Sequence, residues 1–107
     1  METPTPDELT LLHANVCQAL GDPKRIQILY ALYRRPRHVS ALARDLNLPQ
    51  PTVSRHLRVL RQCALVNPER NGAAVVYQLA DTRVIDVLDT MRLVLRSALG
   101  RQTDALV

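Results

Sequence analysis

Aromatic residues are nearly absent from this 107-residue sequence, which has no Phe, no Trp and only three Tyr. The hydrophobic core must therefore be built from Leu, Val, Ile and Ala. The shortage also argues against a protein that binds single-stranded nucleic acid, because such proteins stack successive bases on aromatic rings.

Cysteine is equally scarce, and Cys17 and Cys63 are too few to form a disulfide framework. The sequence has no early apolar run with a basic start and a small-residue cleavage site, as a secretory signal requires. It also has no apolar run long enough to span a bilayer. We therefore expect a soluble, cytoplasmic protein with no membrane partner.

The charge is basic, with 14 Lys+Arg against 10 Asp+Glu, a net charge of +4 and a pI of about 9.7. Thirteen of the fourteen cations are Arg, which contacts phosphates and base edges in a bidentate manner better than Lys does. A basic balance is compatible with nucleic-acid binding but is weak evidence alone. The length fits one domain. We expect it at residues 7–100, with a disordered tail at 1–6 and a second tail at 101–107.

Residues 42–65 predict two helices joined by a tight turn, the stretch around which the remaining chain is organised. The first helix has apolar residues at i, i+1 and i+4, which marks one helical face: Leu42, Ala43 and Leu46. Asn47 then reverses the chain, because Asn tolerates the left-handed conformation. The second helix is expected to start near residues 49–51, where Pro fits a first turn.

This second helix has two chemically different faces at about 100° per residue. Its apolar face is formed by Val53, Leu57 and Leu60. The other side carries cations and hydrogen-bonding groups, namely Gln50, Thr52, Ser54, Arg55, Arg58 and Arg61. Such a face suits a major groove, where Arg can read guanine and Gln can read adenine. The alternative is an ordinary amphipathic helix with a solvated basic face.

The N-terminal part predicts two further helices. The first spans residues 7–21 and ends at Gly21, after which Asp22 caps and Pro23 opens the second. The second helix is apolar on more than one side, through Ile26, Ile28, Leu29, Tyr30, Leu32 and Tyr33. We expect it to be the buried centre of the domain, with Lys24 and Arg25 as surface charges. Pro36 stops it, and residues 37–39 form a short extended piece.

The C-terminal part predicts a hairpin and a last helix. Asn71-Gly72 between strand-like runs at 65–66 and 75–79 is a strong hairpin signal. The tip at residues 69–72 would project as a wing, and Arg70 would reach the DNA backbone or minor groove. Asp81 caps a helix at 82–99, which Gly100 ends. The fold class is therefore mainly α (α+β): a winged helix-turn-helix of five helices and one β-hairpin wing, in the order ααα-α-ββ-α.

Three segments in this order resemble the ArsR/SmtB family of small bacterial and archaeal repressors: ALGDPKRIQIL (19–29), LARDLNLPQPTVSRHLRVLRQCALV (42–66) and NGAAVVYQL (71–79). The resemblance covers roughly residues 9–99. It implies a homodimer paired through the first and last helices, here through Leu9, Leu12, Val16, Leu88, Met91 and Leu95. It also implies binding to double-stranded DNA at a palindromic operator, and release when a metal or other effector binds.

Two positions depart from the pattern of that family. Pro49 replaces the Ser that usually caps the second helix of the motif, a cap that contributes about 1 kcal/mol. Ala64 replaces the usual Gly at its end, so a left-handed Ala is expected to add roughly 1 kcal/mol of strain. Neither change removes the fold prediction.

The sequence does not identify the effector. The family's metal sensors often carry Cys-x-Cys before the turn, where this chain has Ala41-Leu42-Ala43, and the last helix offers only Asp ligands. The family's redox sensors pair a Cys in the second helix with a Cys in the last helix, and the position that resembles the first of these holds Tyr30 in this chain. His13 and Cys17, four residues apart, are weak candidates for a metal site shared with the other subunit. The alternative is a surface His and a small buried thiol. We expect no cofactor, and we expect Cys63 and His56 to have packing roles.

Three functions compete at this level. The favoured one is a homodimeric, sequence-specific transcriptional regulator, a repressor released by an effector, in which Gln50, Thr52, Ser54 and Arg55 read base edges and Arg58 and Arg61 contact phosphates. The second is a winged-helix interaction module whose basic face binds an acidic protein. An enzyme is disfavoured, because no Cys–His–acid constellation is recognisable.

Overall fold

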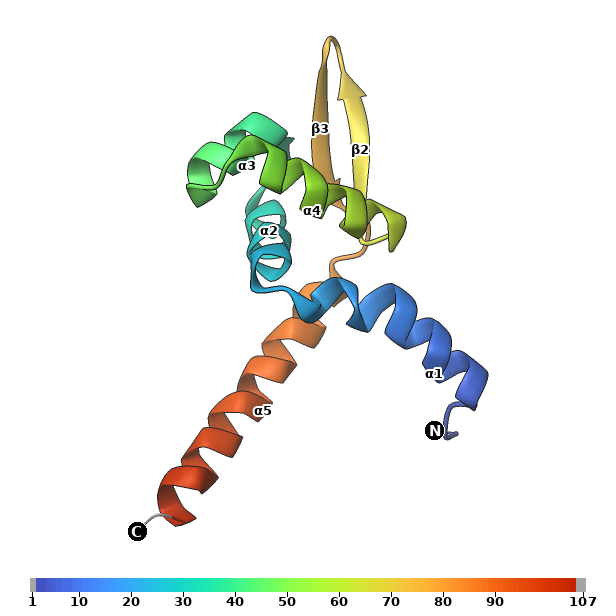
Figure 1. The fold of residues 1–107 in the computed structure, drawn as a ribbon, viewed down its shortest axis with the longest axis vertical. Coiled ribbons are helices and arrows are strands. Elements are labelled where there is room, and N and C mark those ends of the chain that lie inside the picture. Colours follow the sequence, from blue (N-terminus) through green and yellow to red (C-terminus); the bar gives the residue numbers. More distant parts are fainter. Residues whose placement is uncertain (1, 106–107) are drawn as a thin grey trace.

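Three helices pack together at the centre of the protein: α2 (Pro23–Arg34), α3 (Val39–Leu46) and α4 (Gln50–Gln62) (Figure 1). The computed structural model describes the backbone of residues 2–105 and the side chains of residues 2–102. A β-hairpin extends from one side of the three helices, and two helical arms leave the opposite side. The winged helix-turn-helix prediction is confirmed.

Helix α2 is the buried centre, as predicted. Asp22 caps it through a 2.8 Å hydrogen bond from the Lys24 amide to Asp22 Oδ1, and Pro23 occupies its first turn. Its fully enclosed residues are Ile28, Leu29, Ala31 and Leu32. Tyr33 was expected among them but is 55% exposed, because the helix is covered on only part of its circumference.

The turn between α3 and α4 follows the prediction closely. Asn47 adopts the left-handed conformation with φ of 54°, and the Leu48 amide donates to the Ala43 carbonyl at 2.9 Å. Pro49 precedes α4 without providing a side-chain cap. At the other end of α4, Ala64 is left-handed with φ of 60°, and the Leu65 amide donates to the Leu60 carbonyl at 2.9 Å. This bond closes the helix as a Schellman motif.

The sheet has three antiparallel strands in the order β1-β3-β2, formed by β1 (Arg37–His38), β2 (Val66–Asn71) and β3 (Ala74–Leu79). The predicted extended piece is therefore β1. The hairpin turn lies one residue later than predicted, because Asn71 pairs with Ala74 and the two central residues are Gly72 and Ala73. Gly72 has φ of 66°. A glycine at the first central position is typical of a type II′ turn, whose twist matches that of the strands.

The first arm is not the single helix predicted at 7–21. Helix α1 (Pro6–Leu12) begins inside the expected tail, where the Thr5 hydroxyl caps the Glu8 amide at 3.2 Å. A π-helical turn, η1 (His13–Cys17), and a 3₁₀ turn, η2 (Ala19–Gly21), follow. The bond from the Gln18 amide to the His13 carbonyl, 2.9 Å long, spans five residues. This wider turn changes the direction of the apolar face, which sequence spacing alone does not reveal.

The second arm is α5 (Arg83–Ala105), about 34 Å long at 1.5 Å per residue. Only its first turns reach the core, through Val84, Ile85 and Leu88. The prediction that Gly100 ends the helix is wrong. Nothing lies within 4 Å of the position of a Gly100 Cβ, and the helix continues to Ala105 without a left-handed residue there. No described helix is both long and apolar enough to cross a membrane.

The two arms make the molecule extended. Its radius of gyration is 16.4 Å and its dimensions are 56 × 36 × 20 Å. A compact chain of this length has a radius of gyration of about 13 Å. The difference arises from α1 and α5, which diverge from the core (Figure 1) and carry exposed apolar residues.

Candidate nucleic-acid interface

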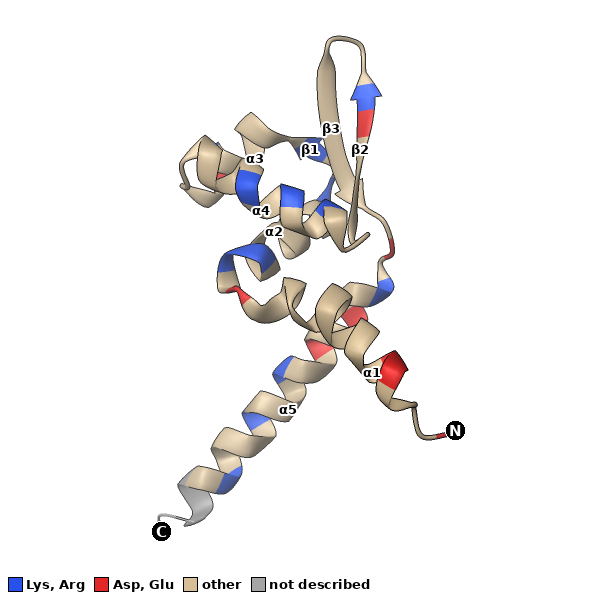
Figure 2. Ribbon diagram, turned by 45° about the vertical axis from the view of Figure 1, so that its right-hand side comes forward, with Lys and Arg blue, Asp and Glu red and all other residues tan. Residues whose placement is uncertain are grey.

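Helix α4 separates its buried and exposed residues as its sequence predicted. Val53, His56, Leu57 and Leu60 are buried against the core. Of the predicted contact residues on this helix, Gln50, Ser54, Arg55, Arg58 and Arg61 are exposed, whereas Thr52 is half-buried. Figure 2 shows basic positions along α4, and no Asp or Glu occurs within that helix. The helix therefore presents an exposed, purely basic and hydrogen-bonding face.

Four guanidinium groups near this face have no partner within the described part of the chain. They belong to Arg55, Arg58, Arg61 and Arg70, for which no side-chain hydrogen bond or ion pair forms. In contrast, the guanidinium groups of Arg25, Arg37, Arg83 and Arg92 are all engaged with protein oxygen atoms. These arginines thus fall into two groups: those bonded to protein oxygen atoms within the fold, and those without such a bond. The second group includes all four arginines that were predicted to contact DNA.

The Arg25 guanidinium is bonded within the fold, which corrects the expectation that Arg25 is a surface charge. Its side chain is 15% exposed. Nε donates to the Ala19 carbonyl at 2.7 Å and Nη2 donates to the Gln18 carbonyl at 2.9 Å. Nη1 lies 3.5 Å from Nδ1 of His56 on α4. Arg25 therefore connects the end of the first arm to the buried side of α4, while Lys24 beside it is exposed as predicted.

His56 is 7% exposed, in agreement with its predicted packing role. Burial lowers the pKa of His56, and the positive charges of Arg25, Arg55 and Lys24 act in the same direction, whereas Asp22 opposes them. The neutral ring can accept the Arg25 hydrogen bond through Nδ1, provided that Nε2 carries the proton. The buried side of α4 thus carries a neutral imidazole, whereas its exposed side carries the basic residues.

Arg37 supports the other helix of the motif. Its side chain is 10% exposed, and Nη1 donates to Asp45 Oδ2 of α3 at 2.8 Å. Nη2 donates to the Ala31 carbonyl near the end of α2 at 2.8 Å. Because Arg37 itself belongs to β1, one guanidinium joins β1, α2 and α3. This junction was not recognised from the sequence, since no local spacing relates Arg37 to Asp45.

Arg70 on the wing shares a concavity with a residue near the end of α4. Arg61 and Arg70 line one concavity of about 300 Å³ together with Pro68, Val75 and Tyr77. Tyr77 was not among the predicted site residues. The alternation of side chains along two paired strands could have placed it beside Arg70, but only once the register of the hairpin was known.

Within one chain, the weak metal candidates His13 and Cys17 have no third ligand among the described residues, and a site shared with a second subunit stays a prediction. His13 and Cys17 are both exposed and lie in the π-helical turn, so Cys17 is not the buried thiol of the alternative reading. Cys63 is half-buried at the end of α4 and packs against the core, and both cysteines are free. Among the described residues, no group of three or more His, Cys, Asp or Glu side chains could hold a metal ion.

The predicted dimer residues fall into two groups. Leu9, Leu12, Met91 and Leu95 are 46%, 47%, 52% and 56% exposed, and Val16 is half-buried. Leu88 is only 4% exposed, because the first turns of α5 pack onto the core of the same chain. Its assignment to the interface is therefore corrected to a core role. Further exposed apolar residues extend the surface on both arms: Leu11, Val87, Leu93, Val94 and Leu99.

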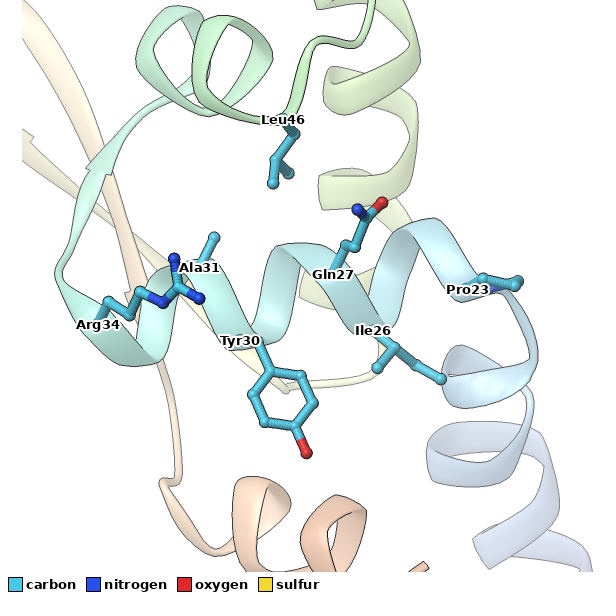
Figure 3. A pocket seen from close by; sticks show the side chains of 7 residues that line it. All are labelled: Pro23, Ile26, Gln27, Tyr30, Ala31, Arg34 and Leu46. Carbon is cyan, nitrogen blue, oxygen red and sulfur yellow. The ribbon is translucent and has the colours of Figure 1, made fainter. Parts of the chain in front are cut away.

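A hollow of about 310 Å³ lies along α2 and reaches Leu46 at the end of α3. Figure 3 shows Gln27 and Ala31 on the side of α2 that faces Leu46, whereas Tyr30 points away from α3 toward α5. Tyr30 and Ile26 also line a neighbouring apolar hollow of about 250 Å³ with Leu88, Met91, Arg92 and Leu95. The two hollows thus meet at Tyr30.

Comparison with known proteins relates this geometry to a family. Residues 22–68, from the cap of α2 to the start of the wing, match the model of the bacterial regulatory protein, arsR family. The transcriptional regulator NmtR of Mycobacterium tuberculosis is 43% identical over 76 residues, which are 71% of this chain and 63% of NmtR. The chain thus spans less than two thirds of that relative's length.

Two solved structures extend the similarity to almost the whole fold. The crystal structure of Rv0081 from M. tuberculosis is 33% identical, with a TM-score of 0.78, and covers 94% of this chain and 99% of its own. The homodimeric winged helix-turn-helix DNA-binding domain of a possible ArsR-family transcriptional regulator from Mycobacterium bovis is 28% identical, with a TM-score of 0.76 and coverage of 94% and 95%. On its sequence and its fold, the chain belongs to the arsR family of bacterial regulatory proteins.

Proposed function

We propose that the protein is a homodimeric, sequence-specific DNA-binding transcriptional repressor that acts in the cytoplasm. The observation that carries this proposal is the set of unpartnered guanidinium groups along the exposed face of α4, with none of the acidic residues that would neutralise them on that helix. The relatives are transcriptional regulators, which is a non-enzymatic role. Family membership favours duplex DNA over an acidic protein as the partner of this face.

In this proposal α4 enters the major groove. Gln50, Thr52, Ser54 and Arg55 lie toward its N-terminal end and contact base edges, and bidentate donation by Arg55 to guanine provides most of the discrimination. Arg58 and Arg61 lie further along the helix and contact phosphates, as does Arg70 on the wing. Phosphate contacts fix the position of the protein on the duplex, so that base contacts in the groove can specify sequence.

The dimer is proposed to form through the two arms. Their exposed Leu, Met and Val side chains would be costly to leave in water, and a second copy can bury them. Two α4 helices related by a two-fold axis would meet half-sites about 34 Å apart, one turn of the duplex. A palindromic operator follows from this symmetry. The effector that releases the repressor is not specified by the described side chains.

The test is to select duplexes from a random pool with the purified protein and to measure binding across salt concentrations. The enriched duplexes should contain inverted repeats with half-site centres about 10 base pairs apart. If a dimer neutralises on the order of eight phosphates, log affinity should fall against log salt with a slope of roughly −7. Failure to enrich any sequence, or affinity that does not vary with salt, would overturn the proposal.

A further inference from the structure

The register of the wing decides which way Arg70 faces. Arg70 pairs with Val75 and Pro68 pairs with Tyr77, and opposite residues of an antiparallel pair share one face of the sheet. Because side chains alternate along a strand, Val66 lies on this same face as Pro68 and Arg70. Val66 is 1% exposed in the core. Arg70 is therefore on the inner face of the wing, the face that turns toward α4.

Arg61, near the end of α4, lines the same concavity of about 300 Å³ as Arg70 and Tyr77. None of the residues lining it is acidic. The nearest wing carboxylate, that of Glu69, belongs to the opposite face, where it accepts a 3.2 Å hydrogen bond from Gln78 Nε2. Arg61 and Arg70 thus line one concavity from different elements, with no acidic residue in its lining. Arg70 also lines a second concavity of about 310 Å³, which Glu69 shares.

An anion that enters this concavity meets only positive charge among the residues that line it. Like charges that share a concavity repel each other, and an anion between them replaces repulsion with two attractions. A phosphodiester has two non-bridging oxygen atoms, and each can accept hydrogen bonds from one planar guanidinium. The hydroxyl of Tyr77 also has no hydrogen-bond partner within the described structure, so it provides a third donor at the same place.

We infer that Arg61 and Arg70 bind one and the same backbone phosphate of the operator in each half-site, with Tyr77 as the third donor. This inference rests on the proposed function and adds to it the way in which the wing binds. Arg70 is then not a minor-groove reader. Together with Arg61 it forms a clamp that fixes the distance along the duplex between the wing and α4, and so the register of α4 in the major groove.

A double-mutant cycle on the salt dependence tests the clamp. The variants are Arg61→Gln, Arg70→Gln and the double substitution, each measured on a duplex selected by the wild-type protein. Each phosphate contributes about 0.9 to the slope, so loss of one shared phosphate per protomer lowers the slope of the double variant by roughly 1.8 per dimer. Each single variant lowers it by less, because the other arginine still neutralises that phosphate. If the two arginines contacted different phosphates, the slope of the double variant would instead fall by roughly 3.6 per dimer, and that of each single variant by half as much.

Neutral methylphosphonate, placed at one backbone position at a time, locates the contact. One position per half-site should weaken the wild-type protein and remove the affinity difference between wild type and both single variants. Arg58→Gln is the matched control, because it removes an exposed charge from the same helix as Arg61. Its affinity difference from the wild type should disappear when the methylphosphonate is at a different backbone position. Tyr77→Phe should weaken binding several-fold without changing the slope, since the hydroxyl carries no charge.

The outcomes distinguish the clamp from the proposed repressor function. If the wild-type protein binds duplex DNA but the effects of Arg61→Gln and Arg70→Gln map to different phosphates, the clamp is wrong and the repressor function stands. If the wild-type protein binds no duplex, both are wrong. All three arginines are exposed, so thermal unfolding of each variant should match the wild type and exclude a folding defect.

Discussion

The Tyr30 hydroxyl on α2 donates a 2.6 Å hydrogen bond to Oδ1 of Asp89 on α5. Arg92 completes the cluster, since Nη1 lies 3.1 Å from the same oxygen atom and its guanidinium carbon lies 5.8 Å from the centre of the Tyr30 ring. The Tyr30 hydrogen bond, followed by that of Arg92, holds the pKa of Asp89 below its ordinary value. Within the described part of the chain, no other side-chain hydrogen bond connects α5 to another helix or strand.

Tyr30→Phe should therefore loosen the angle between α5 and the core that carries α4. In the proposed dimer the arms set the separation of the two α4 helices. A small change at the base of a helix about 34 Å long would therefore move them out of register with the two proposed half-sites. We expect operator affinity to fall several-fold while the protein remains dimeric, as measured by gel shift and sedimentation. Tyr33→Phe is the control, because Tyr33 lies on the same helix, is 55% exposed and forms no hydroxyl hydrogen bond there. Equal affinities for both variants would show that the Tyr30–Asp89 bond does not control the spacing.

Acid should destabilise the protein through His56. Burial lowers its pKa below the ordinary 6.5, so as the pH falls the unfolded chain takes up this proton before the folded chain does. The stability contributed by the neutral ring is complete above pH 6.5 and is lost progressively toward the lowered folded pKa. Urea unfolding between pH 8 and pH 5 should show this loss, and His56→Gln should reduce it. A His56→Gln protein that keeps the full pH dependence of the wild type would show that the loss arises from another group.

Arg37→Met should reduce the stability of the protein by about 2 kcal/mol, within the range for losing hydrogen bonds of a charged group. The substitution leaves the Ala31 carbonyl and Asp45 without their donor, whereas the Met side chain retains the apolar packing. Arg35→Met is the matched control, since Arg35 is 70% exposed and only 3.9 Å from the same carboxylate. The control should change stability by less than about 0.5 kcal/mol in urea titrations. Similar losses for both would show that total charge, rather than the junction, sets stability.

Leu95→Glu should convert the proposed dimer to monomer at micromolar concentrations. Leu95 is 56% exposed on α5, and a carboxylate at a buried interface would lose its hydration without gaining a partner. Ser97→Glu introduces the same charge nearly on the other side of α5 and should leave the dimer intact. Sedimentation equilibrium distinguishes the two. A Leu95→Glu protein that stays dimeric would place the interface elsewhere.

Arg55→Ala should weaken binding to the selected operator by about 1–3 kcal/mol and relax sequence preference at the base pair it contacts. Arg101→Ala removes the same charge from the part of α5 farthest from α4, and it should change affinity only slightly. Gel shifts against the operator and against single-base variants provide both values. Unchanged affinity for Arg55→Ala would mean that α4 enters the groove in another rotational register.

Local signals in the sequence determined much of this fold. The Asp22-Pro23 cap, the left-handed Asn47 and the alternation of apolar and basic residues along α4 each act over a few residues, so they could be interpreted without a structure. Gly72 predicted the hairpin for the same reason, although not its exact register. Gly100 misled the prediction, because a glycine is compatible with the end of a helix but does not enforce it.

Only the tertiary structure decided which charges are free. In the sequence, Arg25 and Arg55 are similar cations on amphipathic helices, yet Arg25 is held by carbonyl groups and His56 while Arg55 is open to a partner. These bonds join residues far apart in the chain, such as Arg25 with His56 and Tyr30 with Asp89, and no periodicity encodes such distances. Local propensity therefore set the elements and the basic face of α4. Packing set which arginines remain available to a binding partner, because a guanidinium is free only where no folded-chain oxygen lies within its reach.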